Sequence, residues 1–300
     1  MATSITVGRA YASEDGAYQL PNDTQEHERL DAQYRAFADV MGGKVFHGAS
    51  LPRNPKRILD IGCGTGIFTA QLARLFPSAD VVGVDLSPVP TGRHGDVPNA
   101  RFLLGSVGEL LSRGELQPGS FDYVFERLTI LGIVDWEAHL RDVVVPLLAP
   151  GGVVEIQEYD SMPRAGLRGC AGEVHGTELG DRWEWFRLFV EDTTKIGLDL
   201  RVGSHMEELM AGAGLGVIGA DVYDIPNGGP ASSRGDDNED EYWKTVVDTY
   251  WGVVERNSGR RRTAEVLADM RRGYDETFMA DIADLIVRLH VVVGRKPASQ

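Results

Sequence analysis

The sequence predicts an α/β fold built on a doubly wound parallel sheet, and three observations support this. Short apolar runs alternate with longer segments of helical spacing over residues 57–158, which is typical of parallel strands joined by crossover helices. A turn with three glycines joins the first run to the helix after it. The chain has 300 residues and is 42% hydrophobic, so it can bury a substantial core.

Composition excludes several classes of protein. With 30 Lys and Arg against 45 Asp and Glu, the formal net charge of −15 repels nucleic acid. The longest apolar stretch, 143–154, is broken by proline and glycine and is shorter than the roughly 20 residues that cross a bilayer. The N-terminal residues lack the pattern of a secretory signal, and two cysteines make no disulfide framework. We therefore expect a reducing, cytoplasmic location, with neither nucleic acid nor membrane as partner.

Residues 1–55 are predicted to form an N-terminal arm and a helix. The first 24 residues are polar and punctuated by glycine and proline, as in an extended arm. Apolar residues then recur at spacings of three and four, which predicts an amphipathic helix over 24–41 that ends at two glycines. The apolar face of this helix comprises Leu30, Tyr34, Phe37, Ala38 and Met41.

Residues 56–160 are predicted to form the core of the sheet. Strands are expected at 57–61, 80–85, 100–104, 121–126 and 153–158, with helices at 68–76 and, disturbed by Pro146, at 136–148.

Residues 161–300 are predicted to complete a single domain with substrate-side helices and the last two strands. The expected order is a loop over 161–176, an aromatic-rich helix at 178–196, a helix at 206–213, a strand at 217–225, an acidic loop at 227–240, helices at 241–256 and 262–280, and a strand at 285–293.

The glycine turn is the most informative segment. Gly62, Gly64 and Gly66 occupy alternate positions between a strand and a helix, where backbone N–H groups and the helix N-terminus face a polar or anionic ligand. A dinucleotide fingerprint needs its third glycine where Ile67 stands. Asp85 ends the second strand, where a carboxylate accepts both hydroxyls of a ribose. A nucleoside without a diphosphate fits best, and a tight bend without ligand is the alternative.

These motifs resemble those of class I S-adenosylmethionine-dependent methyltransferases. The resemblance covers about residues 56–158 and rests on residues 60–66 (DIGCGTG) and 82–87 (VGVDLS). It implies a Rossmann-like sheet of seven strands and S-adenosylmethionine as the cofactor. It also implies that the methionine end of the cofactor is lined by Asp60, Gly62, Cys63, Gly64, Thr65 and Gly66.

The same resemblance implies contacts to the adenosine part of the cofactor. Asp85 would hold the ribose, and Leu86 would lie beside the adenine. Many family members have an acid after the third strand, but this chain has Ser106 and Val107 there. The Ser106 hydroxyl is then the group expected to bind the adenine amino group.

Three further stretches are similar to the fungal LaeA-type methyltransferases, many of which act in secondary metabolism. They are residues 18–26 (YQLPNDTQE), 121–127 (FDYVFER) and 148–152 (LAPGG). The resemblance implies that the N-terminal arm folds over the cofactor and brings Tyr18 and Arg29 close, with Arg127 near the pocket. The family includes both small-molecule enzymes and regulators, so it does not name the methyl acceptor.

Candidate catalytic and substrate residues follow from the topology. Methyl transfer needs two collinear reactants, and a phenol acceptor also needs a base. The carboxyl ends of the fourth and fifth strands carry Glu126, Arg127, Glu158 and Tyr159. Glu158 is the preferred base and His175 the second. Apolar contacts to the acceptor are expected from Met162 and from an aromatic helix that contains Trp183, Trp185, Phe186 and Phe189.

Each of these candidates has a purely structural alternative. The aromatic helix has the spacing of a core helix, and His175 can be a solvated loop residue. His139 is expected to be an exposed helix residue, and Cys63 a small turn residue. The acidic run at 236–241 lacks the ligand spacing of a calcium loop, and no Cys/His pairing suggests zinc, so no metal is expected.

Three functions remain in competition. The leading one is methyl transfer to a small, largely apolar natural product, with oxygen as the accepting atom. The second is a cofactor-binding regulatory protein that uses residues 227–280 as a partner surface. The third, a nicotinamide oxidoreductase, conflicts with Ile67 in the glycine turn. The oligomeric state stays open.

Overall fold

The computed structural model describes residues 4–6, 9–11, 23–47, 51–167, 173–226, 249–279 and 284–298. Their contacts divide the chain into two compact units. The first unit comprises Met1–Glu158, Gly203–Val222 and His290–Gln300, and the second comprises Tyr159–Val202 and Tyr223–Leu289. The predicted division into an arm, a core and a substrate-side part stays a prediction.

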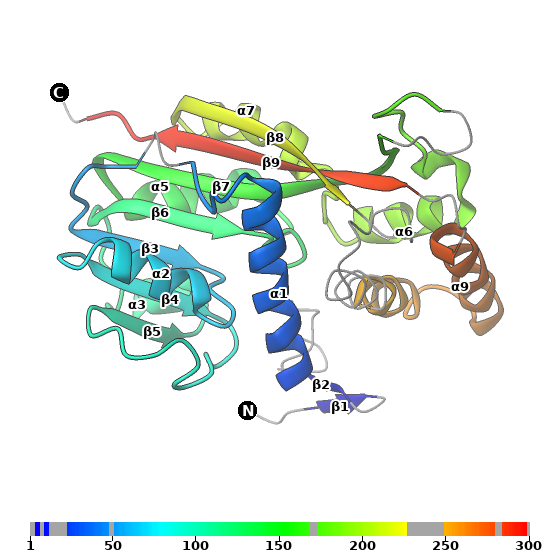
Figure 1. The fold of residues 1–300 in the computed structure, drawn as a ribbon, viewed down its shortest axis with the longest axis horizontal. Helices are drawn as coiled ribbons and strands as arrows, with labels where there is room; N and C mark the ends of the chain where they lie inside the picture. The colour runs from blue at the N-terminus through cyan, green and yellow to red at the C-terminus, as the bar shows by residue number, and fades with distance from the viewer. Residues whose placement is uncertain are drawn as a thin grey trace. The chain divides into compact units, whose positions relative to one another are not determined.

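The strands are β1 (Ser4–Thr6), β2 (Arg9–Tyr11), β3 (Arg57–Ile61), β4 (Asp80–Asp85), β5 (Ala100–Leu104), β6 (Phe121–Arg127), β7 (Leu148–Ala165), β8 (Gly216–Pro226) and β9 (Leu285–Arg295). β1 and β2 form an antiparallel ribbon, and the other seven form one sheet in the order β5-β4-β3-β6-β7-β9-β8 (Figure 1). β3 pairs in parallel with both β4 and β6, so the chain winds outward in one direction and then in the other. The predicted doubly wound sheet is confirmed.

The helices are α1 (Thr24–Val40), α2 (Ile67–Leu75), α3 (Val107–Ser112), α4 (Trp136–Ala138), α5 (Val145–Leu147), α6 (Glu184–Thr194), α7 (Val202–Gly212) and α9 (Ala264–Met279). A π-helical turn, η2 (His139–Val144), joins α4 to α5, and η3 (Gly180–Arg182) is a short 3-10 helix. Residues 249–258 are also helical. The helix predicted over 136–148 is disturbed, but the π turn ends at Val144, before Pro146, which stands in the first turn of α5.

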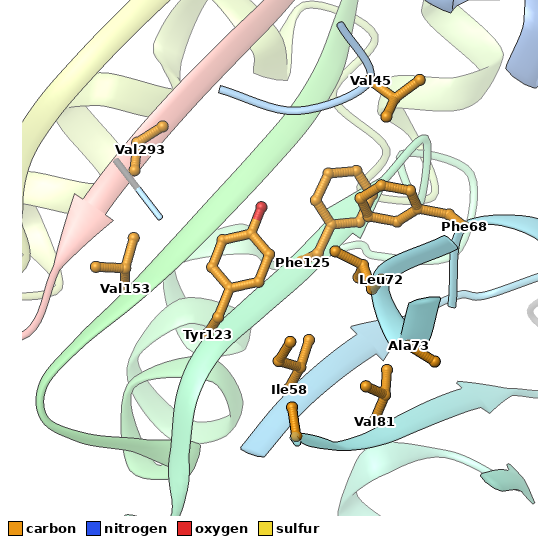
Figure 2. Packing of buried hydrophobic residues seen from close by; sticks show 11 residues of the cluster. Val45, Ile58, Phe68, Leu72, Ala73, Val81, Tyr123, Phe125, Val153 and Val293 are labelled. Carbon is orange, nitrogen blue, oxygen red and sulfur yellow. The ribbon is translucent and has the colours of Figure 1, made fainter. Parts of the chain in front are cut away.

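The core of the first unit lies between α2 and the sheet (Figure 2). Phe68 from α2 packs on Phe125 from β6, with 4.1 Å between the ring centroids. Leu72, Ile58 and Tyr123 are fully buried beside them. Burial of each such side chain is worth about 1.5 to 3 kcal/mol, so this contact fixes α2 and the turn before it on β3.

β7 is longer than the strand predicted at 153–158, and the loop predicted from residue 161 is therefore wrong at its start. Asp160 and Arg164 lie on the same buried face of β7, and their carboxylate and guanidinium are 2.6 Å apart. Arg201 and Glu178 complete the network, at 3.3 Å from Asp160 and 2.8 Å from Arg164 respectively. The glycines of 161–176 suggested a loop, but the strand extends to Ala165 and these ion pairs satisfy its buried charges.

The aromatic helix α6 forms the core of the second unit. Trp185 packs edge-on against Tyr274 at 5.0 Å between centroids, and its indole N–H donates to the hydroxyl of Thr277 at 2.9 Å. Phe186 and Met162 are also buried, and both lie close to Gly180. The buried face of this helix thus packs as a core helix does, and its role at a substrate site stays a prediction.

Candidate active site

The glycine turn between β3 and α2 has a backbone that requires glycine. Gly62, Gly64 and Gly66 have φ angles of 69°, 55° and 78°, in the left-handed region that other residues avoid. A Cβ atom on Gly66 would lie 2.7 Å from the ring of Phe102. Gly62 is exposed, so backbone of the turn faces outward at the carboxyl end of β3. The turn is thus shaped for close approach of a ligand.

Asp85 at the end of β4 is bonded to this turn. Its carboxylate accepts hydrogen bonds from the N–H of Gly64 and from that of Ser87, both at 2.8 Å. Burial raises the pKa of Asp85, and the two amides oppose that rise. A carboxylate has about four acceptor positions, and these amides use two of them. Acceptor capacity for both hydroxyls of a ribose therefore remains.

Asp60 lies in β3, directly before the turn, and is buried. It accepts a hydrogen bond of 2.6 Å from the hydroxyl of Thr69 on α2. Burial raises the pKa of Asp60 to about 7, although Thr69 and the charge of Arg127 lower it. A cationic group bound here would favour the ionised form and displace the proton.

Helix α1 covers the glycine turn, at the end of the sheet to which the β3 and β4 arrows point (Figure 1). Asp31 on this helix accepts a hydrogen bond of 2.6 Å from the hydroxyl of Thr65 and one of 2.7 Å from Arg93. Leu30 lies 3.4 Å from the position of a Cβ on Gly64. The helix was predicted from its apolar spacing, which carries no information about the partners of Asp31.

The arm residues proposed for the cofactor are only partly visible. Arg29 is buried on α1, where its Nη2 lies 2.6 Å from Oε1 of Glu26, which is also buried. Tyr18 lies outside the described residues. The roles of both residues at the cofactor stay predictions.

The residues expected near the adenine have different surroundings. Leu86 is 40% exposed beside Asp85, whereas Val107 is buried at the start of α3. Ser106 caps α3. Its hydroxyl accepts a hydrogen bond from the N–H of Glu109 at 3.2 Å, and its own N–H donates to the side-chain carboxylate of Glu109 at 3.0 Å. The Ser106 hydroxyl keeps its hydrogen for a further partner, so its predicted contact stays a prediction.

Cys63 is buried within the turn. Burial raises the pKa of its thiol well above the usual value, with the charges of Asp60 and Asp85 acting in the same direction. A neutral thiol at this position agrees with the interpretation of Cys63 as a small turn residue.

A cluster of polar side chains lies where β6 ends, beside the middle of β7, so Glu158 does not stand at the carboxyl end of its strand as predicted. The hydroxyl of Thr129 lies 2.8 Å from Oε1 of Glu126 and 2.9 Å from Oε1 of Glu158. The Thr129 N–H donates to the same Glu158 oxygen at 2.6 Å, and Nε2 of His139 lies 2.9 Å from Oε2 of Glu126. The Thr129 methyl is 2.9 Å from a Cβ built on Gly62, so the cluster borders the glycine turn.

The two carboxyl groups of this cluster are fully buried. Burial and the nearby charge of Glu126 raise the pKa of Glu158 to about 8, against the amides of Thr129 and Ile130. Burial alone would lower the pKa of His139, but Glu126 outweighs it and raises that pKa. The His139 side chain is only 14% exposed, so the prediction of an exposed helix residue is wrong.

Thr129 was not among the residues predicted for the site. The signal available was a polar residue shortly after the carboxyl end of a predicted strand. That signal is weak, because the partner carboxylate of Glu158 is distant in sequence.

Arg127 points into the packing between α1 and the sheet. It donates to Oε1 of Gln157 at 2.8 Å and to the carbonyl of Val45 at 2.6 Å. Burial lowers its pKa, and the charges of Glu155 and Asp60 raise it. Its guanidinium lies between 5.0 and 5.8 Å from the ring centroids of Tyr34, Phe37, Phe68 and Phe125. Its predicted place near the pocket is consistent with its electrostatic effect on Asp60.

The remaining candidates belong to the second unit. His175 is half-exposed, and its Nε2 lies 2.9 Å from Oδ2 of Asp224. Tyr159 and Trp183 are partly exposed, whereas Met162 and Phe186 are buried. The roles of all five at a substrate site stay predictions.

The described part of the chain lacks two kinds of feature. No group of three or more His, Cys, Asp or Glu side chains is placed to hold a metal ion. No helix there combines the length and apolar character that a membrane span requires.

Comparisons with known proteins agree with this geometry. A family model described as a methyltransferase domain matches residues 28–220. The secondary metabolism regulator laeA of Coprinopsis cinerea is 34% identical over 199 residues, which cover 63% of this chain and 47% of the relative. The methyltransferase str2 of Strobilurus tenacellus is 32% identical over 151 residues, or 50% of this chain and 52% of the relative. The chain thus spans about half the length of the curated relatives it matches.

Solved structures with a similar fold include the phosphoethanolamine N-methyltransferase 2 of Haemonchus contortus in complex with S-adenosyl-L-methionine. It is 21% identical, covers 89% of this chain and 57% of its own, and has a TM-score of 0.46.

Proposed function

The chain belongs to the methyltransferase-domain family, and we propose that it binds S-adenosylmethionine and transfers the methyl group to an oxygen atom of a small, largely apolar natural product. The family match covers the glycine turn, Asp85 and the carboxylate cluster. One observation carries the cofactor assignment. The Asp85 carboxylate is bonded to the N–H of Gly64, which joins a ribose acceptor to the glycine turn.

The residues at the turn fit this cofactor. Asp85 retains acceptor positions for two ribose hydroxyls, and the exposed backbone of Gly62 allows a ligand to approach closely. The N–H groups of residues 62, 63, 64 and 66 are hydrogen-bonded within the protein and shape the turn. Asp60 would hold the ammonium group of the methionine part, because a cation shifts its carboxyl to the ionised form. When bound, S-adenosylmethionine supplies a methyl group activated by a sulfonium.

Transfer to an oxygen acceptor releases a proton, and Glu158 is proposed to receive it. The pKa of Glu158, raised to about 8, is closer to the value near 10 of a phenol than that of an ordinary carboxyl is. His175 remains the second candidate, paired with Asp224 at 2.9 Å. Met162, Tyr159, Trp183 and Phe186 remain the proposed contacts of the acceptor.

A regulatory function is the second candidate, because several relatives carry the name of a secondary metabolism regulator. Such a protein would bind the cofactor and a protein partner without turning over a small molecule. The proposed partner surface, 227–280, includes residues 227–248, which lie outside the described part of the structure.

Two measurements on the purified chain test these proposals. Calorimetry with S-adenosylmethionine and S-adenosylhomocysteine tests cofactor binding, and absence of heat with both would refute the assignment. Incubation with methyl-labelled cofactor and a panel of phenols, thiols and amines tests transfer and the accepting atom. Binding without transfer of label to any of them would favour the regulatory function. Displacement of bound S-adenosylhomocysteine by NADH would instead favour an oxidoreductase.

A further inference from the structure

We propose that the proton released by the methyl acceptor leaves through a relay of four side chains, in which Glu158 passes a proton through Thr129 to Glu126, and His139 beside Glu126 releases one to water. This inference rests on the proposed methyl transfer and goes beyond it. It assigns a hydroxyl and an imidazole that the sequence did not suggest, and it makes Glu126 the final base.

The hydrogen bonds of the cluster give the relay two distinct ends. Both oxygens of Glu126 are engaged, Oε1 with the Thr129 hydroxyl at 2.8 Å and Oε2 with His139 at 2.9 Å. In Glu158 only Oε1 has partners, whereas Oε2 is buried and has no hydrogen-bond partner in the structure. A buried oxygen without a partner is costly, so Oε2 is the atom that faces a ligand.

The Thr129 hydroxyl can connect the two carboxyl groups because it has one hydrogen and accepts another. When Glu158 is protonated on Oε1, it donates to Thr129, which in turn donates to an ionised Glu126. The reverse arrangement places the proton on Glu126. The distances of 2.9 and 2.8 Å allow this exchange without movement of heavy atoms. Two such close carboxyl groups share one proton more readily than they both ionise.

The carboxyl group of Glu126 faces Glu158, and so do the uncharged amides of Thr129 and Ile130. His139 faces Glu126 from η2. Burial and the charge of Glu126 keep Glu158 mostly protonated at neutral pH, which is the state that the relay requires. The imidazole stabilises the negative charge on Glu126 and connects it to the surface, because its side chain is 14% exposed.

The transfer step balances as follows. The acceptor oxygen forms its bond to the methyl carbon while its bond to hydrogen breaks, and the electron pair of the broken carbon–sulfur bond stays on sulfur. Oε2 of Glu158 takes the proton as Oε1 releases one to Thr129, whose own hydrogen moves to Glu126. Glu126 receives this hydrogen on Oε1 and loses its negative charge. The protonated imidazole of His139, which keeps its hydrogen bond from Nε2 to Oε2 of Glu126, then releases the proton of its other ring nitrogen to water.

Two irregularities of the backbone support the assignment of this cluster as a relay. Leu128, directly before Thr129, has a φ of 52°, which is uncommon for a residue other than glycine and carries a conformational cost. The π-helical turn begins at His139. Such turns are rare and often occur at functional sites. Both irregularities flank a member of the relay.

A titration of the full chain tests the relay without any substrate. With glutamate carbon-13 labelled at the carboxyl group, NMR is expected to show the Glu126 signal moving at the pH at which Glu158 loses its proton in the wild type. Thr129→Val removes the connecting hydroxyl, so only the Glu158 signal should move at that pH, whereas Thr129→Ser should behave as the wild type. A Glu126 signal that stays unchanged at that pH in the wild type, or identical responses of the Val and Ser variants, would overturn the relay.

Single-turnover methyl transfer to a phenol from the labelling panel provides the second test. Thr129→Val is expected to lower the rate at least about tenfold and Thr129→Ser by less than about threefold. His139→Ala should slow transfer, and added imidazole should restore it. Thermal unfolding and calorimetry with S-adenosylhomocysteine confirm that each variant is folded and binds. Equal rates in the Val and Ser variants would overturn the relay, whereas a wild type that binds no cofactor would overturn the proposed function and leave the titration unaffected.

Discussion

Replacement of Asp85 by alanine tests the cofactor site most directly. Its carboxylate accepts from the N–H groups of Gly64 and Ser87, each at 2.8 Å, and is proposed to accept from two ribose hydroxyls. Asp85→Ala removes all four acceptor positions while the strand that carries the residue stays paired with its neighbours. We expect both weaker cofactor binding and a less stable glycine turn.

The size of the effect follows from the bonds that are lost. When a charged acceptor is removed, its hydrogen-bond donors are left without partners, and the binding free energy weakens by about 1 to 3 kcal/mol. Since about 1.4 kcal/mol corresponds to tenfold in affinity, Kd should rise about 5- to 150-fold. The amides of Gly64 and Ser87 lose their partner in the free protein too, so the free energy of unfolding should fall by a similar amount.

Isothermal titration calorimetry with S-adenosylhomocysteine measures the change in Kd, and urea unfolding measures the change in stability. Asp80→Ala is the matched control, because Asp80 begins the same strand, is about half exposed, and pairs with Arg57 and Arg101 at 3.7 and 3.5 Å. It should leave Kd unchanged and alter stability by less than about 1 kcal/mol. A folded Asp85→Ala variant with wild-type Kd would refute the ribose assignment.

Three further predictions concern stability. The free energy of unfolding should fall as pH rises from about 4 to about 8, because Asp60 and Glu158, with pKa values raised to about 7 and about 8, make the folded chain bind more protons than the unfolded chain. Urea unfolding across this range checks it, and an equally steep fall in the Asp60→Asn, Glu158→Gln variant would contradict it. Gly66→Ala should lower the melting temperature more than Gly92→Ala. Both glycines have positive φ angles, but of the two only Gly66 would place a Cβ against a neighbour, 2.7 Å from the Phe102 ring. Equal losses of melting temperature would refute this. Asp31→Ala should lower stability by about 1 to 3 kcal/mol through its lost buried bonds, and unchanged urea unfolding would show that α1 contributes little there.

The elements around the glycine turn could be predicted from sequence because their signals are local. Strands β3, β4 and β5 begin and end where the apolar runs do, and α2 is displaced by one residue from the helix predicted at 68–76. Alternating glycines and the acid at the end of β4 are visible in a short stretch. The structure then joins them through a single hydrogen bond between Gly64 and Asp85.

Features that depend on distant partners were missed. Asp31 and Arg29 are buried on a helix whose predicted buried face was apolar, because Thr65 and Arg93 satisfy Asp31 from elsewhere in the chain. His139 was expected to be exposed and is paired with Glu126 instead. In each case a polar residue is buried only because a partner from another element satisfies it, and periodicity carries no information about that partner.

The path of the chain through β7, β8 and β9 has a consequence for engineering. Each of these strands starts in one compact unit and ends in the other, so the second unit consists of two separate stretches of sequence, Tyr159–Val202 and Tyr223–Leu289. A swap of this unit between relatives therefore needs four crossover points, three of which lie within strands and need matched registers. Exchange of one stretch alone would pack its apolar surface against a foreign partner stretch. Recombination is thereby restricted, and single substitutions within the existing framework are the easier route to variants.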